Sequence, residues 1–252
     1  MESAPTPVAE AEATISPVGR IFGVFFSPKA TFEDIVRKPS WIAPLLVLLA
    51  TGFLLNYALI TRANWVQIVK EQIAKNGMAS RQMDRLEEEK KEKAYEDAAA
   101  RTKVIRYVRG GIGWPVALLF SALLYFGAYR LIGGARITYG LTFAIVTFAS
   151  LPMALREILG AVVSWIKEPS AIDPENYLAS NPAALLPTDA PSWQIVPLAF
   201  LDLFAIWALV LVAIGVSAAD PKKVPFGKSL GISVGLHVTL GLFFTMIAWV
   251  FS

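Results

Sequence analysis

WIAPLLVLLATGFLLNYALI, residues 41–60, is the stretch that decides the fold of this chain. It is twenty residues long, contains no charged side chain, and is bounded by Ser40 on one side and Thr61-Arg62 on the other. A helix of about 20 apolar residues is long enough to cross the roughly 30 Å hydrocarbon core of a bilayer. The stretch therefore predicts a transmembrane helix.

Comparable apolar runs recur along the chain, at about residues 112–132, 141–165, 195–216 and 229–251. The whole sequence is 55% hydrophobic and only 17% charged, which is typical of a membrane protein. In lipid, backbone groups must pair within their own segment or in a closed barrel, and these runs lack the two-residue alternation of barrel strands. The sequence thus predicts an all-α integral membrane protein, a bundle of five transmembrane helices.

Residues 1–24 form a different kind of segment. They are rich in Ala, Pro and Glu, and they lack the apolar core of a signal peptide. We expect 1–24 to be a disordered polar tail and 25–252 to be the membrane domain. The chain has no cysteine, which excludes disulfides and thiolate chemistry, and its net charge of +3 is too small and scattered to indicate nucleic acid as a partner.

Lys and Arg near the span ends indicate the orientation, because cytoplasmic loops carry an excess of them. If the spans alternate, one side receives nine such residues: Arg20, Lys29, Arg37, Lys38, Arg130, Arg136, Lys222, Lys223 and Lys228. The loop after the third span carries only Lys167 and faces the other side. This pattern predicts a membrane protein with a cytoplasmic N-terminus and its C-terminus on the opposite side.

The long first loop, residues 62–110, conflicts with this orientation, because its twelve Lys and Arg against eight Asp and Glu then lie outside. Its apolar spacing, with Val66, Val69 and Ile73 on one face, predicts helix. The run EEEKKEK, residues 87–93, is typical of a solvated helical face; the alternative is a docking site for a partner or for lipid headgroups.

The segment before the first span, residues 25–38, has the pattern of a short interfacial helix. Ser27-Pro28 is a helix start, and Phe32 and Ile35 lie on one apolar face. We expect Phe32 and Ile35, with Trp41 at interface depth, to anchor this helix among the headgroups and to set the entry angle of the first span.

Several stretches resemble one family. FSPKATFEDIVRKPSWIAPLL (26–46), NGMASRQMDR (76–85), FASLPMAL (148–155), LDLFAIWALVLVAIGV (201–216) and FGKSLGISV (226–234) are similar to Yip family domains, the Ypt/Rab-interacting membrane proteins, in their bacterial form. The fourth-span pattern, with Asp202, Phe204, Trp207 and Gly215 in matching places, is the most specific part. The resemblance covers roughly residues 20 to 250.

The resemblance implies five spans and a cytoplasmic N-terminus, which agrees with the short-loop charges. Because the similar members are bacterial, it also implies the bacterial inner (plasma) membrane as the location. Eukaryotic members of the family associate with Rab-type GTPases and act in membrane traffic. Only forty residues precede Trp41 in this chain, and Rab-type GTPase binding is therefore not expected here.

Ionisable residues inside the spans are the candidate functional residues, because a charge in lipid is costly and must face the bundle interior or water. They form an expected intramembrane polar network of Arg156, Glu157, Asp202 and His237. Arg156 and Asp202 lie at similar depth and predict an ion pair, with Glu157 turned about 100° away on its helix. Pro152 predicts a kink close to this polar pair.

The stretch GISVG, Gly231 to Gly235, matches the nucleophile elbow of hydrolases, and His237 follows it. An elbow needs a strand, a turn and a helix, whereas these residues lie in an apolar span. We interpret Gly231 and Gly235 as a helix-packing contact and Ser233 as bonded to a helical carbonyl. No catalytic, metal or cofactor site is predicted.

These observations favour a non-enzymatic scaffold of Yip type that organises the membrane or recruits partners. Its partners are the lipid bilayer and other membrane proteins or a second copy of the chain. The alternative is a small transporter or channel that uses the four intramembrane side chains.

Overall fold

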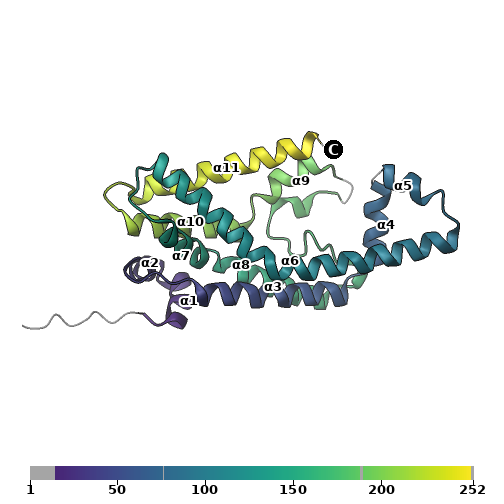
Figure 1. Cartoon of the computed structure of the whole chain (residues 1–252), viewed down its shortest axis with the longest axis horizontal. Coiled ribbons are helices and arrows are strands. Elements are labelled where there is room, and N and C mark those ends of the chain that lie inside the picture. Colours follow the sequence, from purple (N-terminus) through teal and green to yellow (C-terminus); the bar gives the residue numbers. More distant parts are fainter. Residues whose placement is uncertain (1–14, 76, 188–189, 251–252) are drawn as a thin grey trace, which may run out of the picture.

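The computed structural model describes residues 15–75, 77–187 and 190–250. All regular structure in these residues is helical, and Figure 1 shows an elongated bundle whose long helices run roughly along one axis. Within these described residues, four segments are long and apolar enough to span a membrane, and a bent pair of helices taken as one span makes a fifth. The all-α membrane fold is confirmed. The five segments are α3 (Ile42–Arg62), α6 (Glu88–Leu131), α7 with α8 (Tyr139–Ala149, Leu151–Ile166), α9 with α10 (Ser192–Ala199, Leu203–Ala219) and α11 (Phe226–Val250).

The shorter elements lie at the two ends of the bundle. Helices α1 (Pro17–Phe26) and α2 (Pro28–Arg37) lie at one end, and α4 (Trp65–Lys75) and α5 (Gly77–Met83) lie at the other (Figure 1). Between the third and fourth spans run two short 3-10 turns, η1 (Pro169–Ala171) and η2 (Pro182–Leu185).

Helix α1 corrects the expectation of a disordered tail up to residue 24; residues 1–14 of that tail lie outside the described residues. Ser16 caps α1 by accepting a hydrogen bond from the Gly19 amide at 3.1 Å, and Pro17 occupies the first turn. Arg20 then ties α1 to α2 through a buried ion pair with Asp34, Nε to Oδ2 at 2.7 Å. The cap and the ion pair therefore offset the entropy lost when α1 becomes ordered. The composition of the segment does not reveal these tertiary contacts.

The structure also corrects the role expected of Phe32 and Ile35. Both side chains are 0% exposed and belong to the main hydrophobic core, where Phe32 packs against Gly215 of α10. A Cβ on Gly215 would lie 2.9 Å from the Phe32 ring, so that glycine permits the close approach of α2 to the bundle. Helix α2 is thus packed on protein and does not lay these two side chains among lipid headgroups.

The outward apolar face at this end belongs to α1 and the start of α3. Val18, Phe22 and Phe26, spaced four apart on α1, are exposed, and Phe26 is 82% exposed. Trp41 is partly exposed and meets Phe143 edge to face, with 5.5 Å between ring centroids. The interface position of Trp41 stays a prediction, and the exposed side chains of α1 are ones that the sequence did not single out.

The third span is interrupted where a kink was expected. Helix α7 ends at Ala149 and α8 begins at Leu151, with Pro152 in the first turn of α8. Proline has no amide hydrogen to donate to the preceding turn, and its ring clashes with the carbonyl four residues earlier. The break therefore falls at Ser150.

Helix α6 is a single element of 44 residues that continues past the bundle (Figure 1). Its first half, residues 88–110, packs on α4, which in turn contacts α5, and we call these three parts together the arm. Trp65, Val69 and Ala99 form part of a small separate core there, and Lys70 pairs with Glu92 at 2.8 Å. The first loop is thus helical, as predicted.

Gly231 and Gly235 do not form the expected helix contact. Apart from the adjacent residues and the local backbone of α11 itself, no described atom lies within 4 Å of a Cβ built on either residue. Ser233 is buried and shares a 2.6 Å hydrogen bond with the hydroxyl of Tyr129, which corrects the expected bond to a helical carbonyl. Helix α11 therefore meets α6 through hydroxyl groups, and Gly231 and Gly235 are exposed on other faces of the helix.

Candidate functional site

Asp202 lies at the break between the two halves of the fourth span. Helices α9 and α10 meet there at 45°. Its Oδ1 accepts hydrogen bonds from the amides of Phe204 at 2.9 Å and Ala205 at 3.2 Å, so Asp202 is the N-cap of α10. A carboxylate at this position satisfies two otherwise unpaired donors and interacts favourably with the helix dipole.

Arg156 of α8 reaches the other oxygen of the same carboxylate. Its Nε lies 3.1 Å from Asp202 Oδ2, and both side chains are largely buried. The ion pair predicted from their depths in the two spans is present. One carboxylate thus joins two spans and starts a helix.

The loop between these spans folds back onto the ion pair. Ser180 donates its hydroxyl hydrogen to Asp202 Oδ2, and Arg156 Nη1 donates to the hydroxyl of Tyr177. The amide of Leu203, the first residue of α10, donates to the carbonyl of Ser180 at 3.0 Å. We call Arg156, Tyr177, Ser180 and Asp202 the polar cluster.

Tyr177 is held tightly in this cluster. Burial raises the pKa of its hydroxyl, an effect that the nearby Arg156 cation partly opposes. A Cβ on Gly160 would lie 2.3 Å from the Tyr177 ring, so the ring packs directly on the backbone of α8. Sequence reasoning missed Tyr177 and Ser180, because nothing in a polar loop indicates that it re-enters the bundle.

Glu157 points to a different set of helices. Its Oε2 accepts from the Thr51 hydroxyl at 2.6 Å and its Oε1 from the Trp114 indole N–H at 2.8 Å. The carboxyl group is buried and links α3, α6 and α8. The expected rotation of Glu157 away from Arg156 is therefore present, and the two neighbours join different halves of the bundle.

His237 on α11 is also separate from the polar cluster. Its Nε2 lies 2.8 Å from the carbonyl oxygen of Phe200, which follows the last turn of α9. The imidazole ring also packs on the Phe200 ring, with 5.3 Å between centroids. Of the four residues expected in one network, hydrogen bonds and an ion pair join Arg156 to Asp202, whereas Glu157 and His237 bond to other partners.

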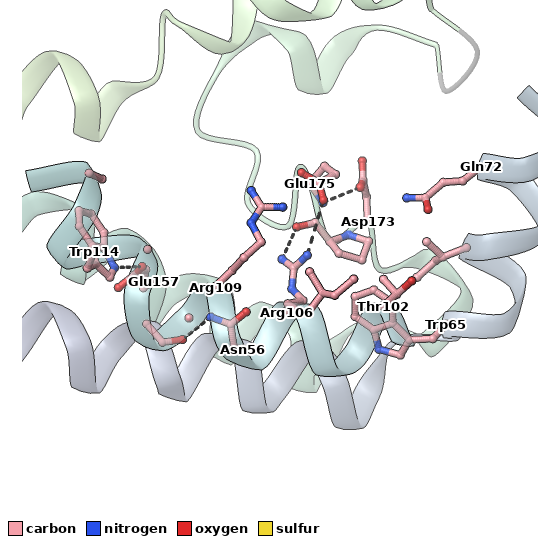
Figure 2. Close-up of a pocket in the computed structure, with 17 residues that line it drawn as sticks. Asn56, Trp65, Gln72, Thr102, Arg106, Arg109, Trp114, Glu157, Asp173 and Glu175 are labelled. Atoms are coloured by element: carbon pink, nitrogen blue, oxygen red, sulfur yellow. Dashed lines mark hydrogen bonds and ion pairs between the residues drawn. The ribbon is translucent and has the colours of Figure 1, made fainter. Parts of the chain in front are cut away.

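A cavity of about 540 Å³ opens beside Glu157 toward the arm (Figure 2). It is bounded by α3, α4, α6, α8 and the loop at residues 173–175, and it contains both Arg106 and Arg109. Within the described part of the chain, no group of three or more His, Cys, Asp or Glu side chains is placed to hold a metal ion.

Comparisons with known proteins agree with this architecture. The family model described as "Yip1 domain" matches residues 22–248. The chain is 25% identical over 240 residues to "Membrane protein YknW" of Bacillus subtilis (strain 168), a match that covers 94% of this chain and 95% of that protein. No solved structure is significantly similar to it. Since the match runs from α1 through nearly all of α11 and includes every span, this chain belongs to the Yip1-domain family.

Proposed function

We propose that the protein is a non-enzymatic scaffold of the bacterial inner membrane that recruits other membrane proteins through its arm. The observation that carries this proposal is the continuity of α6, which runs from Glu88 in the arm to Leu131 at the opposite end of the bundle. Helix α6 stays a single helical element across Pro115, so no non-helical linker separates the arm from the second span. A partner bound to the arm is thereby held at a fixed place relative to the membrane domain.

The surface of the arm suits polar recognition. Its residues 87–93 are charged and solvent-exposed apart from Lys91, which is partly covered. Ion pairs such as Lys90 with Glu87 at 2.8 Å lie on the surface, where they contribute little to stability. These charges are consequently available to a complementary surface at small energetic cost.

Transport through the bundle has less support. Arg156 and Asp202 neutralise each other, and both carboxyl oxygens of Glu157 already accept hydrogen bonds. A solute or ion path needs polar groups that can exchange partners, whereas these groups hold helices together.

The proposed orientation places the N-terminus in the cytoplasm and the arm on the outer side.

The recruiting role is tested by photo-crosslinking in living cells. A photoreactive amino acid at Glu89 or Lys93, both exposed on the arm, should give discrete adducts with the same membrane protein. The same amino acid at Lys222, exposed at the other end of the bundle, is the matched control and should not give them.

Liposome flux provides the opposing result. If the protein is a scaffold, liposomes that contain the purified protein should show no flux of a solute or ion that depends on Asp202. The Asp202→Asn variant should therefore behave like the unchanged protein. Flux lost in that variant, together with an arm that gives no adduct, would overturn the scaffold proposal and support transport.

A further inference from the structure

Three carboxyl groups are buried in the described part of the chain, and two of them face an arginine. Asp34 pairs with Arg20 at 2.7 Å. Asp202 pairs with Arg156 at 3.1 Å. Glu157, the third, is 8% exposed, and the groups that hydrogen-bond to it are both neutral. A buried carboxylate without a counter-ion is costly, so this group requires neutralisation in another way.

The charged groups around Glu157 do not supply the missing counter-charge. Two arginines and two acids share the wall of its cavity: Arg106, Arg109, Asp173 and Glu175. Arg106 lies 3.6 Å from Glu175, which balances its charge. Arg109 is exposed to solvent, which screens it. The titratable hydroxyl of Tyr177 is held in the polar cluster, as described above.

The indole of Trp114 fixes one of the two carboxyl oxygens as an acceptor. Its N–H donates to Glu157 Oε1 at 2.8 Å, and an indole nitrogen can only donate. Gly52 permits this contact, because a Cβ there would lie 3.1 Å from the Trp114 ring and 3.6 Å from Oε1. Any hydrogen on this carboxyl group therefore belongs on Oε2.

The Thr51 hydroxyl faces two acceptors with a single hydrogen. Its oxygen lies 2.6 Å from Glu157 Oε2 and 3.2 Å from the carbonyl oxygen of Leu48, one turn earlier in α3. A hydroxyl has one hydrogen and two lone pairs, so it cannot donate to both at once. With a proton on Oε2, the acid donates to Thr51 and Thr51 donates to Leu48. Each of the two contacts then contains one hydrogen.

The cavity gives this carboxyl group a route to water. Figure 2 shows Glu157 at one end of the cavity and Gln72 of the arm at the other. A polar cavity of about 540 Å³ is large enough for several water molecules. A proton can therefore be exchanged between Oε2 and the solvent on the arm side, although Glu157 lies in the middle of α8.

We propose that Glu157 is a proton-binding site, which carries one proton on Oε2 at neutral pH and receives it from water in the cavity. Binding forms one O–H bond and involves no other bond or electron transfer. Loss of the proton leaves a charge where α3, α6 and α8 meet, at the base of the arm. The inference goes beyond the scaffold role and stands even if the arm recruits no protein.

Infrared spectroscopy of the full-length protein in detergent tests the proposal. A protonated carboxyl group has a carbonyl band separate from that of a carboxylate, and exposed acids are ionised at neutral pH. The unchanged protein should show such a band at neutral pH, and the band should shift in heavy water. Glu157→Gln should lose it. Glu168→Gln, an exposed position just after α8, is the matched control and should keep it.

Isotope labelling decides the question without a variant, even if Glu157→Gln does not fold. Carbon-13 in the side-chain carboxyl of glutamate should lower the frequency of the band, whereas the same label in aspartate should not. Glu157 is the one buried glutamate among the described residues, so a band that follows the glutamate label belongs to it.

A second set of variants tests the hydrogen-bond partner. Thr51→Val should shift the band to higher frequency, because the acid hydrogen loses its acceptor, and Thr51→Ser should restore it. Thr147→Val is the control, since Thr147 is also buried but donates to the Phe143 carbonyl at 2.7 Å. It should leave the band unchanged.

Three results would overturn the proposal. No band in the unchanged protein at neutral pH would mean that Glu157 is ionised. A band that persists in Glu157→Gln, or that follows the aspartate label, would assign the proton to another acid. A band that does not shift in heavy water would mean that the cavity does not exchange the proton.

Discussion

At the scale of single residues, Asp202 has two separable tasks. One oxygen caps α10 and the other pairs with Arg156, so replacing the side chain with an apolar one removes both interactions. Asparagine is as good an N-cap as aspartate but carries no charge. It can therefore separate the contribution of the ion pair from that of the cap.

We expect Asp202→Asn to lower stability by about 3 kcal/mol, because it leaves the Arg156 cation buried without its partner. Arg156→Leu alone should lower it as well. The double variant Arg156→Leu/Asp202→Asn should recover part of the loss, since no orphaned charge remains. Thermal unfolding in detergent measures all three. A double variant as unstable as the sum of the singles would show that the pair contributes no coupling.

At the scale of elements, α1 and α2 differ from what their sequences suggested. The sequence indicated that α2 would face the headgroups, but α1 carries the exposed apolar face. Helix α2 places Phe32 in the protein core, whereas α1 turns Phe22 and Phe26 outward, at the same end of the bundle as the start of α3. An apolar face predicts burial, but it does not distinguish burial in lipid from burial in protein. Only the position of α10 decides this for α2.

We predict that α1 lies in the headgroup region. A nitroxide on a cysteine introduced at Val18 should show the high oxygen accessibility of a lipid environment, and the natural absence of cysteine makes the labelling specific. Phe22→Asp/Phe26→Asp should make that site water-accessible, because each large apolar side chain contributes about 1.5 to 3 kcal/mol when buried.

The conservative control Phe22→Leu/Phe26→Leu should keep the lipid signature. In contrast, Phe32→Ala should destabilise the whole domain by about 3 to 5 kcal/mol, since it leaves a cavity in the core. If the charged pair of substitutions leaves the Val18 label unchanged, α1 is covered by something other than lipid.

The sequence predicts an interaction in this protein when the depth of the two residues in the membrane determines it. It does not predict an interaction that depends on tertiary packing. The five spans and the Arg156–Asp202 pair follow from chain length and helical rise, which are local quantities. The contacts of Tyr177 and Ser180 do not, because they depend on where a loop returns after leaving the bundle. Gly231 and Gly235 show the converse: small residues permit a close approach, but they do not create one.

At the scale of the whole molecule, charges at the two ends disagree about orientation. The end with α1 and α2 carries the basic residues of three short segments, and the first loop, residues 62–110, carries twelve Lys and Arg of its own. The three short segments agree with one another, and the first loop, whose length of about 50 residues lies just under the limit at which the charge rule is counted, opposes them. We therefore retain the cytoplasmic N-terminus as a proposal.

Single cysteines test this orientation directly. In intact spheroplasts an impermeant thiol reagent should label Lys93→Cys on the arm and should spare Lys223→Cys, both positions being exposed in the structure. After permeabilisation both should react equally. Labelling of Lys223→Cys alone would mean that the arm is cytoplasmic and that the short loops point outward.

The polar cluster also has a consequence for biosynthesis. Arg156 leaves the ribosome 46 residues ahead of Asp202, so at ordinary rates of synthesis it waits roughly 2 to 9 seconds for its counter-charge. Tyr177 and Ser180 emerge in between, 21 and 24 residues after Arg156. The Arg156 guanidinium of the nascent third span can therefore first bond to the two hydroxyl groups of the loop that follows it. When the fourth span emerges, Asp202 meets a guanidinium that already has hydrogen-bond partners within the protein.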